Sequence, residues 1–189
     1  MKIIGKEEFL AKKEFFISEM KKGRILIYPT DTIYGLGCDA TNGDAVIKIR
    51  EIKKRDGKPF SIIAPSFDWI RQNCFIDALV EKWLKKLPGS YTFILELRNW
   101  KAISSAVNGG RDSLGVRIPD NWFAEAIKEF GKPFVTTSVN SSGGKNMEKL
   151  EDLDASIKSK VDYIIYEGPL EGNASGVVKL IGGKEEILR

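Results

Sequence analysis

The 189-residue sequence predicts a single α/β domain, spanning residues 1–189, in which flanking helices pack on a twisted mixed sheet. The first observation is that segments with the apolar spacing of a helix alternate with short β-branched runs along the chain. The second is a hairpin pattern near the C-terminus, which favours a mixed sheet over a wholly parallel one. The third is that no internal repeat, low-complexity tract or linker divides the sequence.

Helices are expected where apolar residues recur every three or four positions after a capping residue. In the first helix, Phe9, Phe16 and Met20 share one face and Gly23 ends the pattern. The last but one is bounded by a cap at Asn121. The expected helices cover residues 7–22, 44–54, 66–72, 77–86, 121–130 and 148–158.

The second of these helices carries the densest basic run of the chain. Asp44 can cap it, and Val46, Ile49 and Ile52 are expected to face inward. The basic residues left for another face are Lys48, Arg50, Lys53 and Arg55, followed by Lys58. Such a run is most often a solvated surface, but its position after a loop rich in hydroxyls favours a cleft for phosphate groups.

Strands are expected in short runs of β-branched and aromatic residues bounded by proline or glycine. The strongest covers residues 91–97, directly after a turn at Pro88-Gly89. The last two flank Gly182-Gly183-Lys184 as a hairpin, whereas residues 99–112 are expected to form a mobile polar loop. The expected strands cover residues 24–28, 61–64, 91–97, 114–118, 134–137, 163–166, 177–181 and 185–188.

The composition limits the possible chemistry. The chain has no histidine, which excludes Ser-His-Asp and Cys-His nucleophile systems and removes the commonest zinc ligand. An enzyme of this composition must work through positioning and fixed charge, as in phosphoryl and nucleotidyl transfer. The net charge of +4 is compatible with nucleotide or RNA partners. Two cysteines, read as free thiols, and the lack of a signal peptide or a long apolar run predict a cytoplasmic protein without membrane contact.

Two polar segments and one arginine are candidates for a binding site. The loop over residues 28–38 is rich in hydroxyls and glycine and follows a buried strand. The run over residues 136–144 places further hydroxyls and an amide at the end of another strand, as a ligand crevice or as a turn with a helix cap. Arg117 lies inside an apolar strand, so it needs an anionic partner, which is either an internal carboxylate or a substrate.

Two further glycine motifs are poor matches to nucleotide-binding loops. Residues 35–40 fit the pattern G-x-G-x-x-A, but six residues separate Tyr28 from Gly35 and no helix begins at the glycines. We therefore favour a tight backbone turn or close approach of the backbone to a ligand as the reason for Gly35 and Gly37. Residues 143–146 resemble half of a P-loop, but the first glycine and the Ser/Thr are missing, so a P-loop is rejected.

Taken in order, these segments resemble the YrdC/YciO-type threonylcarbamoyl-AMP synthase family. The resemblance runs from about Tyr28 to the C-terminus and has the length of the family's short, single-domain form. The matching segments are Pro29 to Gly37; Lys48, Lys53 and Arg55; Pro88-Gly89 with Thr92; Leu114 to Pro119; and Ser138 to Gly143. The resemblance implies a twisted α/β sheet around a basic concave cavity.

The resemblance also implies a reaction. L-threonine and bicarbonate form a carbamate, which attacks the α-phosphorus of ATP to give threonylcarbamoyl-AMP and pyrophosphate. A separate threonylcarbamoyltransferase then modifies adenosine 37 of certain tRNAs. Magnesium is expected to arrive with ATP, since no carboxylate cluster in the sequence indicates a dedicated metal site.

The resemblance assigns roles residue by residue. Threonine is expected to bind at Thr32, Arg117, Thr136 and Ser175. Lys53 and Arg55 are the expected catalytic residues, because they would neutralise the triphosphate. ATP is expected to contact Lys48, Lys53, Arg55, Lys58, Ser113, Ser138, Asn140, Asn146 and Arg189.

The sequence departs from the family pattern at three positions, which leaves two alternatives open. Asp56 stands where proline is usual, Ile63 replaces a histidine that contacts threonine in many synthases, and Gly176 replaces a hydroxyl residue. One alternative is a YciO-like protein of the same fold that binds tRNA or double-stranded RNA, with weak or different adenylating activity. The other is an adenylating site that accepts a different carboxylate or carbamate.

Overall fold

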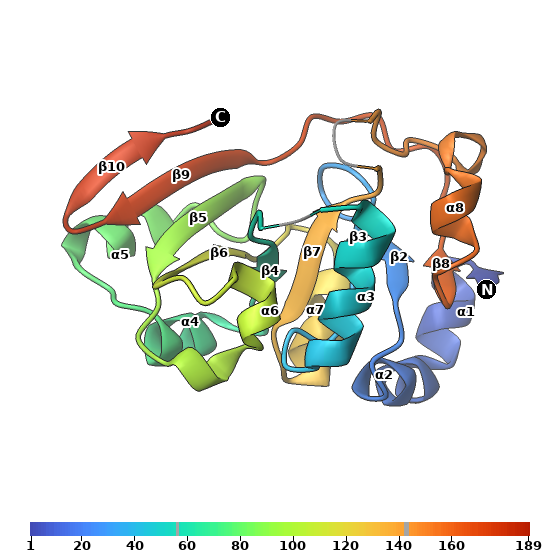
Figure 1. Ribbon diagram of the computed structural model, residues 1–189, viewed down its shortest axis with the longest axis horizontal. Coiled ribbons are helices and arrows are strands. Elements are labelled where there is room, and N and C mark those ends of the chain that lie inside the picture. The colour runs from blue at the N-terminus through green and yellow to red at the C-terminus, as the bar shows by residue number, and fades with distance from the viewer. Residues whose placement is uncertain (56, 142–143) are drawn as a thin grey trace.

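A ten-stranded mixed sheet forms the centre of the computed structural model, which describes residues 1–55, 57–141 and 144–189 (Figure 1). The strand order is β1-β8-β2-β3-β7-β4-β6-β5-β9-β10. The pairs β1–β8, β8–β2, β4–β6 and β5–β9 are parallel, and the others are antiparallel. The strands are β1 (Lys2–Ile4), β2 (Leu26–Tyr28), β3 (Gly35–Gly37), β4 (Ser61–Ile63), β5 (Tyr91–Glu96), β6 (Ser113–Arg117), β7 (Phe134–Ser138), β8 (Tyr163–Ile165), β9 (Gly176–Ile181) and β10 (Lys184–Ile187). The predicted mixed sheet, with a C-terminal hairpin, is confirmed.

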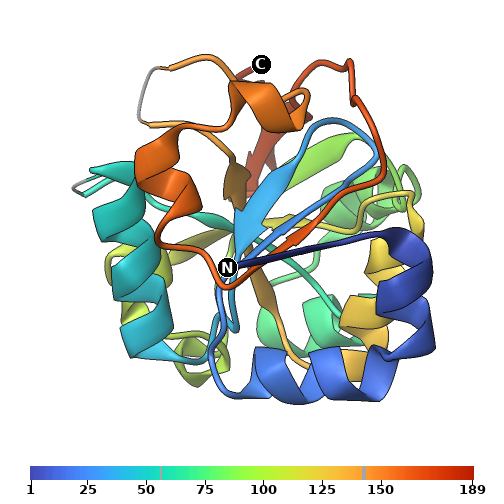
Figure 2. The same cartoon turned by 90° about the vertical axis from the view of Figure 1, so that its right-hand side faces the viewer.

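Helices cover both faces of the sheet. Figure 2 shows α1, α2 and α7 on one side of the sheet and α3 and α8 on the other. The helices are α1 (Lys6–Ala11), α2 (Lys13–Lys21), α3 (Gly43–Lys53), α4 (Phe67–Asn73), α5 (Ala78–Leu84), α6 (Ser105–Asn108), α7 (Trp122–Phe130) and α8 (Ala155–Lys158). Short 3₁₀ turns cover Trp100–Ala102 and Leu150–Asp152. None of the described helices is long and apolar enough to cross a lipid bilayer.

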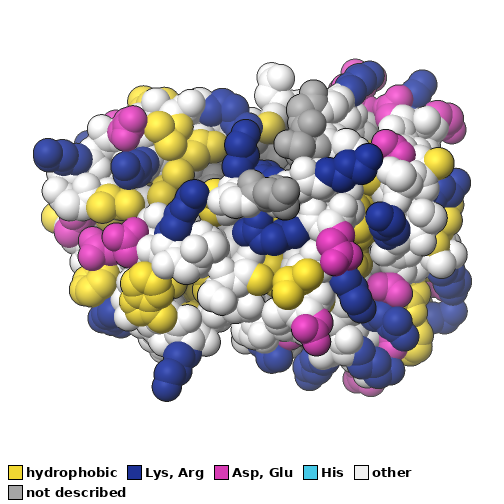
Figure 3. Space-filling model, in the orientation of Figure 1, with side chains coloured by type: hydrophobic (Ala, Val, Ile, Leu, Met, Phe, Trp, Pro, Cys, Tyr) yellow, Lys and Arg dark blue, Asp and Glu magenta, His cyan; other side chains and the backbone are white. Residues whose placement is uncertain are grey.

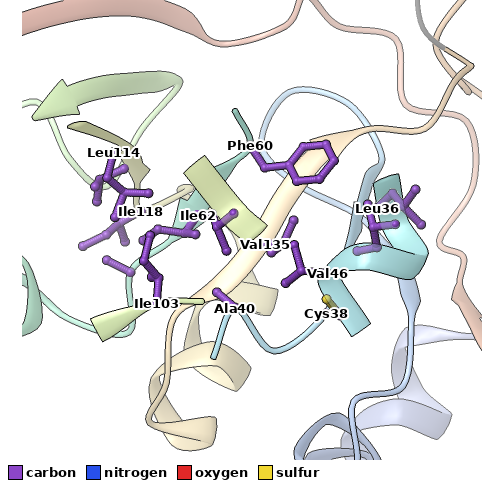
Figure 4. Close-up of a cluster of buried hydrophobic side chains, with 14 of the residues drawn as sticks. Leu36, Cys38, Ala40, Val46, Phe60, Ile62, Ile103, Leu114, Ile118 and Val135 are labelled. Carbon is purple, nitrogen blue, oxygen red and sulfur yellow. The ribbon is translucent and has the colours of Figure 1, made fainter. Parts of the chain in front are cut away.

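Side-chain alternation along the strands creates two hydrophobic cores. In β2, Ile27 points into the larger core, whereas Leu26 and Tyr28 point into the smaller one. Figure 4 shows part of the larger core, in which Val46 of α3 and Val135 of β7 pack together with Phe60. The smaller core lies against α1, α2 and α7. Its buried aromatic side chains include Phe9, Phe16, Tyr28, Phe123, Phe130 and Phe134.

Most expected elements are confirmed, including the inward face of α3 and the cap of α7 at Asn121. Four expectations are wrong in detail. Lys12 interrupts the first helix, and Asn42 rather than Asp44 caps α3 by accepting from the amide of Ala45. The helix expected over 148–158 is replaced by a 3₁₀ turn and α8, because separate aspartate carboxylates cap each piece. The loop over 99–112 contains a 3₁₀ turn and α6.

Two strands have no counterpart in the expected pattern. β1 pairs with β8 at the sheet edge, and β3 occupies the middle of the supposed glycine loop. A Cβ atom on Gly37 would lie 1.9 Å from the carbonyl oxygen of Val135, and one on Gly35 would lie 2.8 Å from the ring of Tyr28. Glycine is therefore required for close packing within the sheet, and the dinucleotide-binding reading is excluded because no helix begins at these glycines. Both cysteines, Cys38 and Cys74, are free thiols and buried, as expected.

Candidate functional site

A cavity of about 410 Å³ opens on the sheet face that carries the smaller core. The register between β4 and β7 shows how it arises. Ile63 pairs with Phe134, and both side chains are buried in the smaller core against α7. Two residues further along, Ser61 pairs with Thr136, and both of these line the cavity. Because residues i and i+2 share a face, the same face changes from apolar under the helix to polar beyond it.

The structure brings most of the sequence-predicted site residues to this cavity. Those that line it are Thr32, Arg55, Arg117, Thr136, Ser138, Asn140, Asn146, Ser175 and Arg189. Other polar lining residues are Thr30, Tyr34, Ser61, Thr92 and Thr137. Ser61 was not singled out from the sequence, although a serine on the inward side of an otherwise apolar strand is a usable signal. Figure 3 views the other face of the molecule, the one covered by α3, and shows several Lys and Arg side chains across its upper middle.

Arg117 has an internal carboxylate partner, which is one of the two alternatives that its sequence context left open. Its Nη2 donates to Oδ1 of Asp31, whose Oδ2 accepts from the backbone amide of Asp120 at 3.0 Å. Its Nη1 lies 3.5 Å from Oγ1 of Thr32. Burial lowers the pKa of the Arg117 guanidinium, while the Asp31 charge opposes this shift. The Asp31 carboxylate leaves Nε of Arg117 without a hydrogen-bond partner.

Arg55 is held by contacts that also leave a donor unused. Its Nη2 donates to the carbonyl oxygen of Pro59 at 3.0 Å, and its guanidinium lies 5.3 Å from the centre of the Phe60 ring. Burial lowers its pKa, and the charge of Arg50 adds to the shift. Among the described residues, Nε of Arg55 and Nε of Arg117 are the buried side-chain polar atoms without a partner. Both arginines line the cavity, and guanidinium groups donate directed hydrogen bonds to carboxylate and phosphate oxygens, so both are suited to bind an anion.

The hydroxyl groups form fixed pairs around the cavity. Oγ1 of Thr30 lies 3.0 Å from Oγ1 of Thr32 and donates to the carbonyl oxygen of Ile33. Oγ1 of Thr92 lies 2.8 Å from Oγ of Ser175, and both side chains are buried. These contacts place hydroxyl dipoles at defined positions, which suits recognition of a small polar ligand.

A strap over residues 167–175 joins β8 to β9 and crosses the sheet from one half to the other (Figure 1). The hydroxyl of Tyr34 donates to the carbonyl oxygen of Gly168 at 2.7 Å. Gly172 packs so closely that a Cβ atom there would lie 2.2 Å from the carbonyl oxygen of Thr32. Arg189 donates through Nε and Nη2 to the carbonyl oxygen of Ser175, at 3.0 and 2.8 Å. The strap and Arg189 therefore form one rim of the cavity.

Four predicted site residues do not line the cavity. Lys48 is exposed because it precedes Lys53 by five residues on α3, which turns it about 140° away around the helix. Lys58 is also exposed, and Ser113 lies four residues before Arg117 on β6, roughly 13 Å along the strand. Lys53 is only 1% exposed and donates to the carbonyl oxygen of Ser138 and to Oδ1 of Asn140.

The departures from the family pattern are also placed by the structure. Ile63 is fully buried in the smaller core and does not line the cavity, because its side chain packs with the face covered by α7. Gly176 begins β9 and is likewise outside the lining, although Ser175 beside it belongs to it. The positions of Asp56, Ser142 and Gly143 lie outside the described residues. Ile63 therefore gives no structural support to a different substrate.

Comparisons with known proteins identify the family of this chain. The family model of the Sua5/YciO/YrdC proteins, described as "Telomere recombination", matches residues 18–189. A Methanocaldococcus jannaschii protein with a provisional assignment as a threonylcarbamoyl-AMP synthase is 34% identical over 181 residues, which cover 94% of this chain and 84% of its own. A Xanthomonas campestris threonylcarbamoyl-AMP synthase is 30% identical and covers 86% and 87%. YciO of Escherichia coli, an uncharacterised protein, is 29% identical and covers 90% and 84%.

The solved structures agree in fold. Sua5 of P. abyssi, solved in complex with L-threonine, superimposes with a TM-score of 0.87 at 26% identity over the whole of this chain. This chain spans only 57% of that Sua5 chain. The crystal structure of E. coli YciO gives a TM-score of 0.83 at 27% identity and covers 95% of this chain and 88% of its own. With its α/β fold, its polar cavity and these matches, the chain belongs to the Sua5/YciO/YrdC family.

Proposed function

We propose that this protein synthesises L-threonylcarbamoyl-AMP from L-threonine, bicarbonate and ATP. The threonine nitrogen and bicarbonate combine as a carbamate with loss of water. A carbamate oxygen then bonds to the α-phosphorus of ATP, while the bond from that phosphorus to the α,β-bridging oxygen breaks and pyrophosphate leaves. The relatives named as threonylcarbamoyl-AMP synthases and the threonine complex of P. abyssi Sua5 support this reaction class.

The observation that carries the proposal is the pair of arginines that line the cavity. Arg55 and Arg117 both line the cavity, and each has a buried Nε without a partner. The reaction brings together two anionic groups, the carboxylate of threonine and the phosphates of ATP. Two arginines on one cavity match that requirement, because guanidinium groups bind carboxylate and phosphate oxygens through directed hydrogen bonds.

We assign the threonine carboxylate to Arg117, which is flanked by the hydroxyl of Thr32. Thr136 and Ser175 line the same cavity and complete the assignment. Threonine would thus meet a group that the protein already holds rigidly through Asp31. A fixed partner reduces the entropy that binding must overcome.

We assign the phosphates of ATP to Arg55 and to the wall formed by Ser138, Asn140 and Asn146, with Arg189 at the rim. The chain contains no histidine, so catalysis rests on orientation of the carbamate and on fixed positive charge at the phosphates. Within the described part of the chain, no group of three or more metal-ligating side chains is placed to hold a metal ion. Magnesium therefore enters the proposal only as the ion that accompanies ATP.

The product would serve the threonylcarbamoyladenosine modification at position 37 of tRNA, through a separate transferase in the cytoplasm. The first test is pyrophosphate release by the purified protein with ATP, magnesium, bicarbonate and threonine. We expect release to require threonine and bicarbonate together. Pyrophosphate release that is equal without threonine, from folded protein, would contradict the proposal.

A YciO-like function in RNA binding is the second candidate, supported by the similarity to E. coli YciO and by the net charge of +4. RNA binding through surface charge weakens steeply with salt, because counterions are released on binding. ATP binding that persists at moderate salt favours the synthase, whereas salt-sensitive tRNA binding without ATP turnover favours the second candidate. Replacing threonine by serine in the same assay tests the choice of amino acid.

A further inference from the structure

Lys53 occupies an unusual place for a lysine in a nucleotide site. It lies in the last turn of α3, and its side chain is almost completely buried. Its ammonium group donates to the carbonyl oxygen of Ser138 at 2.6 Å, to that of Asn140 at 2.9 Å and to Oδ1 of Asn140 at 2.7 Å. An ammonium group has three N–H donors. All three are therefore used within the protein, and none is left for a phosphate oxygen.

The acceptors of Lys53 belong to one wall of the cavity. Asn140 also accepts from Oγ of Ser138 at 2.8 Å. Its Nδ2 donates to the carbonyl oxygen of Gly144 at 2.6 Å and to Oδ1 of Asn146 at 3.0 Å. Lys53 thus holds Asn140, and Asn140 holds Ser138 and Asn146, two further polar residues of the cavity lining.

The contacts of Lys53 place its charged ammonium group among neutral carbonyl and amide oxygens. Burial lowers the pKa of Lys53 to about 8, and the nearby charge of Arg55 contributes to the shift. Hydrogen bonds from a charged donor are roughly twice as strong as those between neutral groups. A single side chain can therefore order a loop that has little regular secondary structure of its own.

We infer that Lys53 is a positioning residue, which acts through Asn140 to hold the wall Ser138–Asn140–Asn146 in shape and does not contact the ligand. Its charge reaches a bound anion only through space. This inference rests on the proposed function for the choice of ATP as the probe. It differs from the role that the sequence suggested, in which Lys53 touches the triphosphate.

The first experiment uses the unaltered protein. Reductive methylation with formaldehyde, followed by peptide mass spectrometry, reports which lysines are accessible. We expect Lys53 to remain unmodified with and without ATP, and Lys82, an exposed lysine in the last turn of α5, to be modified in both. Modification of Lys53 in the free protein that ATP prevents would show a contact residue and overturn the inference. The result without ATP stands even if the protein binds no nucleotide.

The second experiment is a double-mutant cycle with Lys53→Met, Asn140→Ala and the double variant, with Lys82→Met as the matched control. Lys53→Met should raise the Kd for ATP about 10- to 100-fold, the range expected for lost charged hydrogen bonds. It should also speed hydrogen exchange in the peptide around Asn140 about tenfold without ligand. The double variant should bind no more than about threefold more weakly than the weaker single variant, because both act through one network.

Each outcome of this cycle has a clear meaning. The inference would be overturned if the Kd for ATP of the double variant rose by the product of the two single-variant factors and hydrogen exchange in Lys53→Met were unchanged. That result would show that Lys53 and Asn140 contact ATP independently. Failure of the wild-type protein to bind ATP would instead contradict the proposed function, while the exchange measurement would still test the positioning role. If Lys53→Met does not fold, the methylation result decides.

Discussion

The buried pair of Arg117 and Asp31 offers the sharpest test of the proposed threonine site. Only 6% of the Arg117 side chain and 10% of the Asp31 side chain are exposed. Arg117→Met removes the proposed carboxylate partner and leaves Asp31 buried without its cation. Two effects are therefore expected, one on substrate binding and one on stability.

The magnitudes follow from the local environment. Two unit charges about 4 Å apart interact by ~4 kcal/mol at an effective dielectric of about 20, and desolvation offsets part of this. A charged hydrogen bond contributes roughly 1.5–3 kcal/mol net. Because ~1.4 kcal/mol is tenfold, the KM for threonine should rise about 100-fold in Arg117→Met. The Kd for ATP should change less than about threefold, since Arg117 is assigned to the carboxylate alone.

Stability requires its own control. Breaking a buried ion pair by removing one partner costs roughly 3–5 kcal/mol. Arg71→Met removes an arginine whose partner Glu81 is exposed, so its melting temperature should hardly change. Arg117→Lys keeps a cation beside Asp31 but loses the planar fork, so it should lose less stability than Arg117→Met and still bind threonine at least about tenfold more weakly.

The assay is threonine-dependent pyrophosphate release, with thermal melts of the same samples. Equal losses of ATP and threonine binding in Arg117→Lys would show a general collapse of the cavity. An unchanged KM for threonine in a folded Arg117 variant would refute the assignment of the carboxylate.

Three further predictions follow from the site and the sheet. Arg55→Met should raise the Kd for ATP about 10- to 100-fold with little change in melting temperature, as measured by calorimetry; a large drop in melting temperature would show a structural role. Gly37→Ala should lower the free energy of unfolding by several kcal/mol in a denaturant titration, because its Cβ would lie 1.9 Å from a backbone carbonyl, whereas Gly5→Ala, which meets nothing within 4 Å, should be nearly neutral. Burial lowers the pKa of Lys53 to about 8, so above this pH the Lys53 ammonium group is deprotonated in the free protein. A bound polyanion favours the charged form of Lys53, so binding above this pH takes up a proton. ATP affinity should therefore fall as the pH rises through 8, with proton uptake that calorimetry in two buffers detects in the wild type and not in Lys53→Met.

The sequence was sufficient for the fold class because its strongest signals are local. The apolar spacing and the bounding Asn121 and Gly131 define α7 without any tertiary information. β3 could not be predicted in this way, because glycine has no strand preference of its own. It fits between β2 and β7 because a glycine leaves room for the ring of Tyr28 on β2 and for the carbonyl group of Val135 on β7.

Most of the hydroxyl residues and arginines that the sequence predicted for the site line the cavity, but the predicted lysines do not. Hydroxyls and arginines of the ordered motifs reach the cavity, because strand alternation carries Thr136 and Ser138 to the same face. The lysines could not be placed, since a long side chain can point to either side of a helix end. Whether Lys53 contacts a ligand or a main-chain carbonyl depends on how close the backbone after β7 lies to the end of α3, which only the structure shows.

The strap over residues 167–175 has a consequence for the order in which this protein becomes competent. Ser175, the last part of the strap, lines the same hollow as Thr32, which is synthesised more than a hundred residues earlier. A chain still emerging from the ribosome lacks Ser175 and Arg189, so its binding surface is incomplete until synthesis is nearly finished. Substrates therefore cannot assist the first stages of folding, and truncation before the strap should leave a protein unable to retain them.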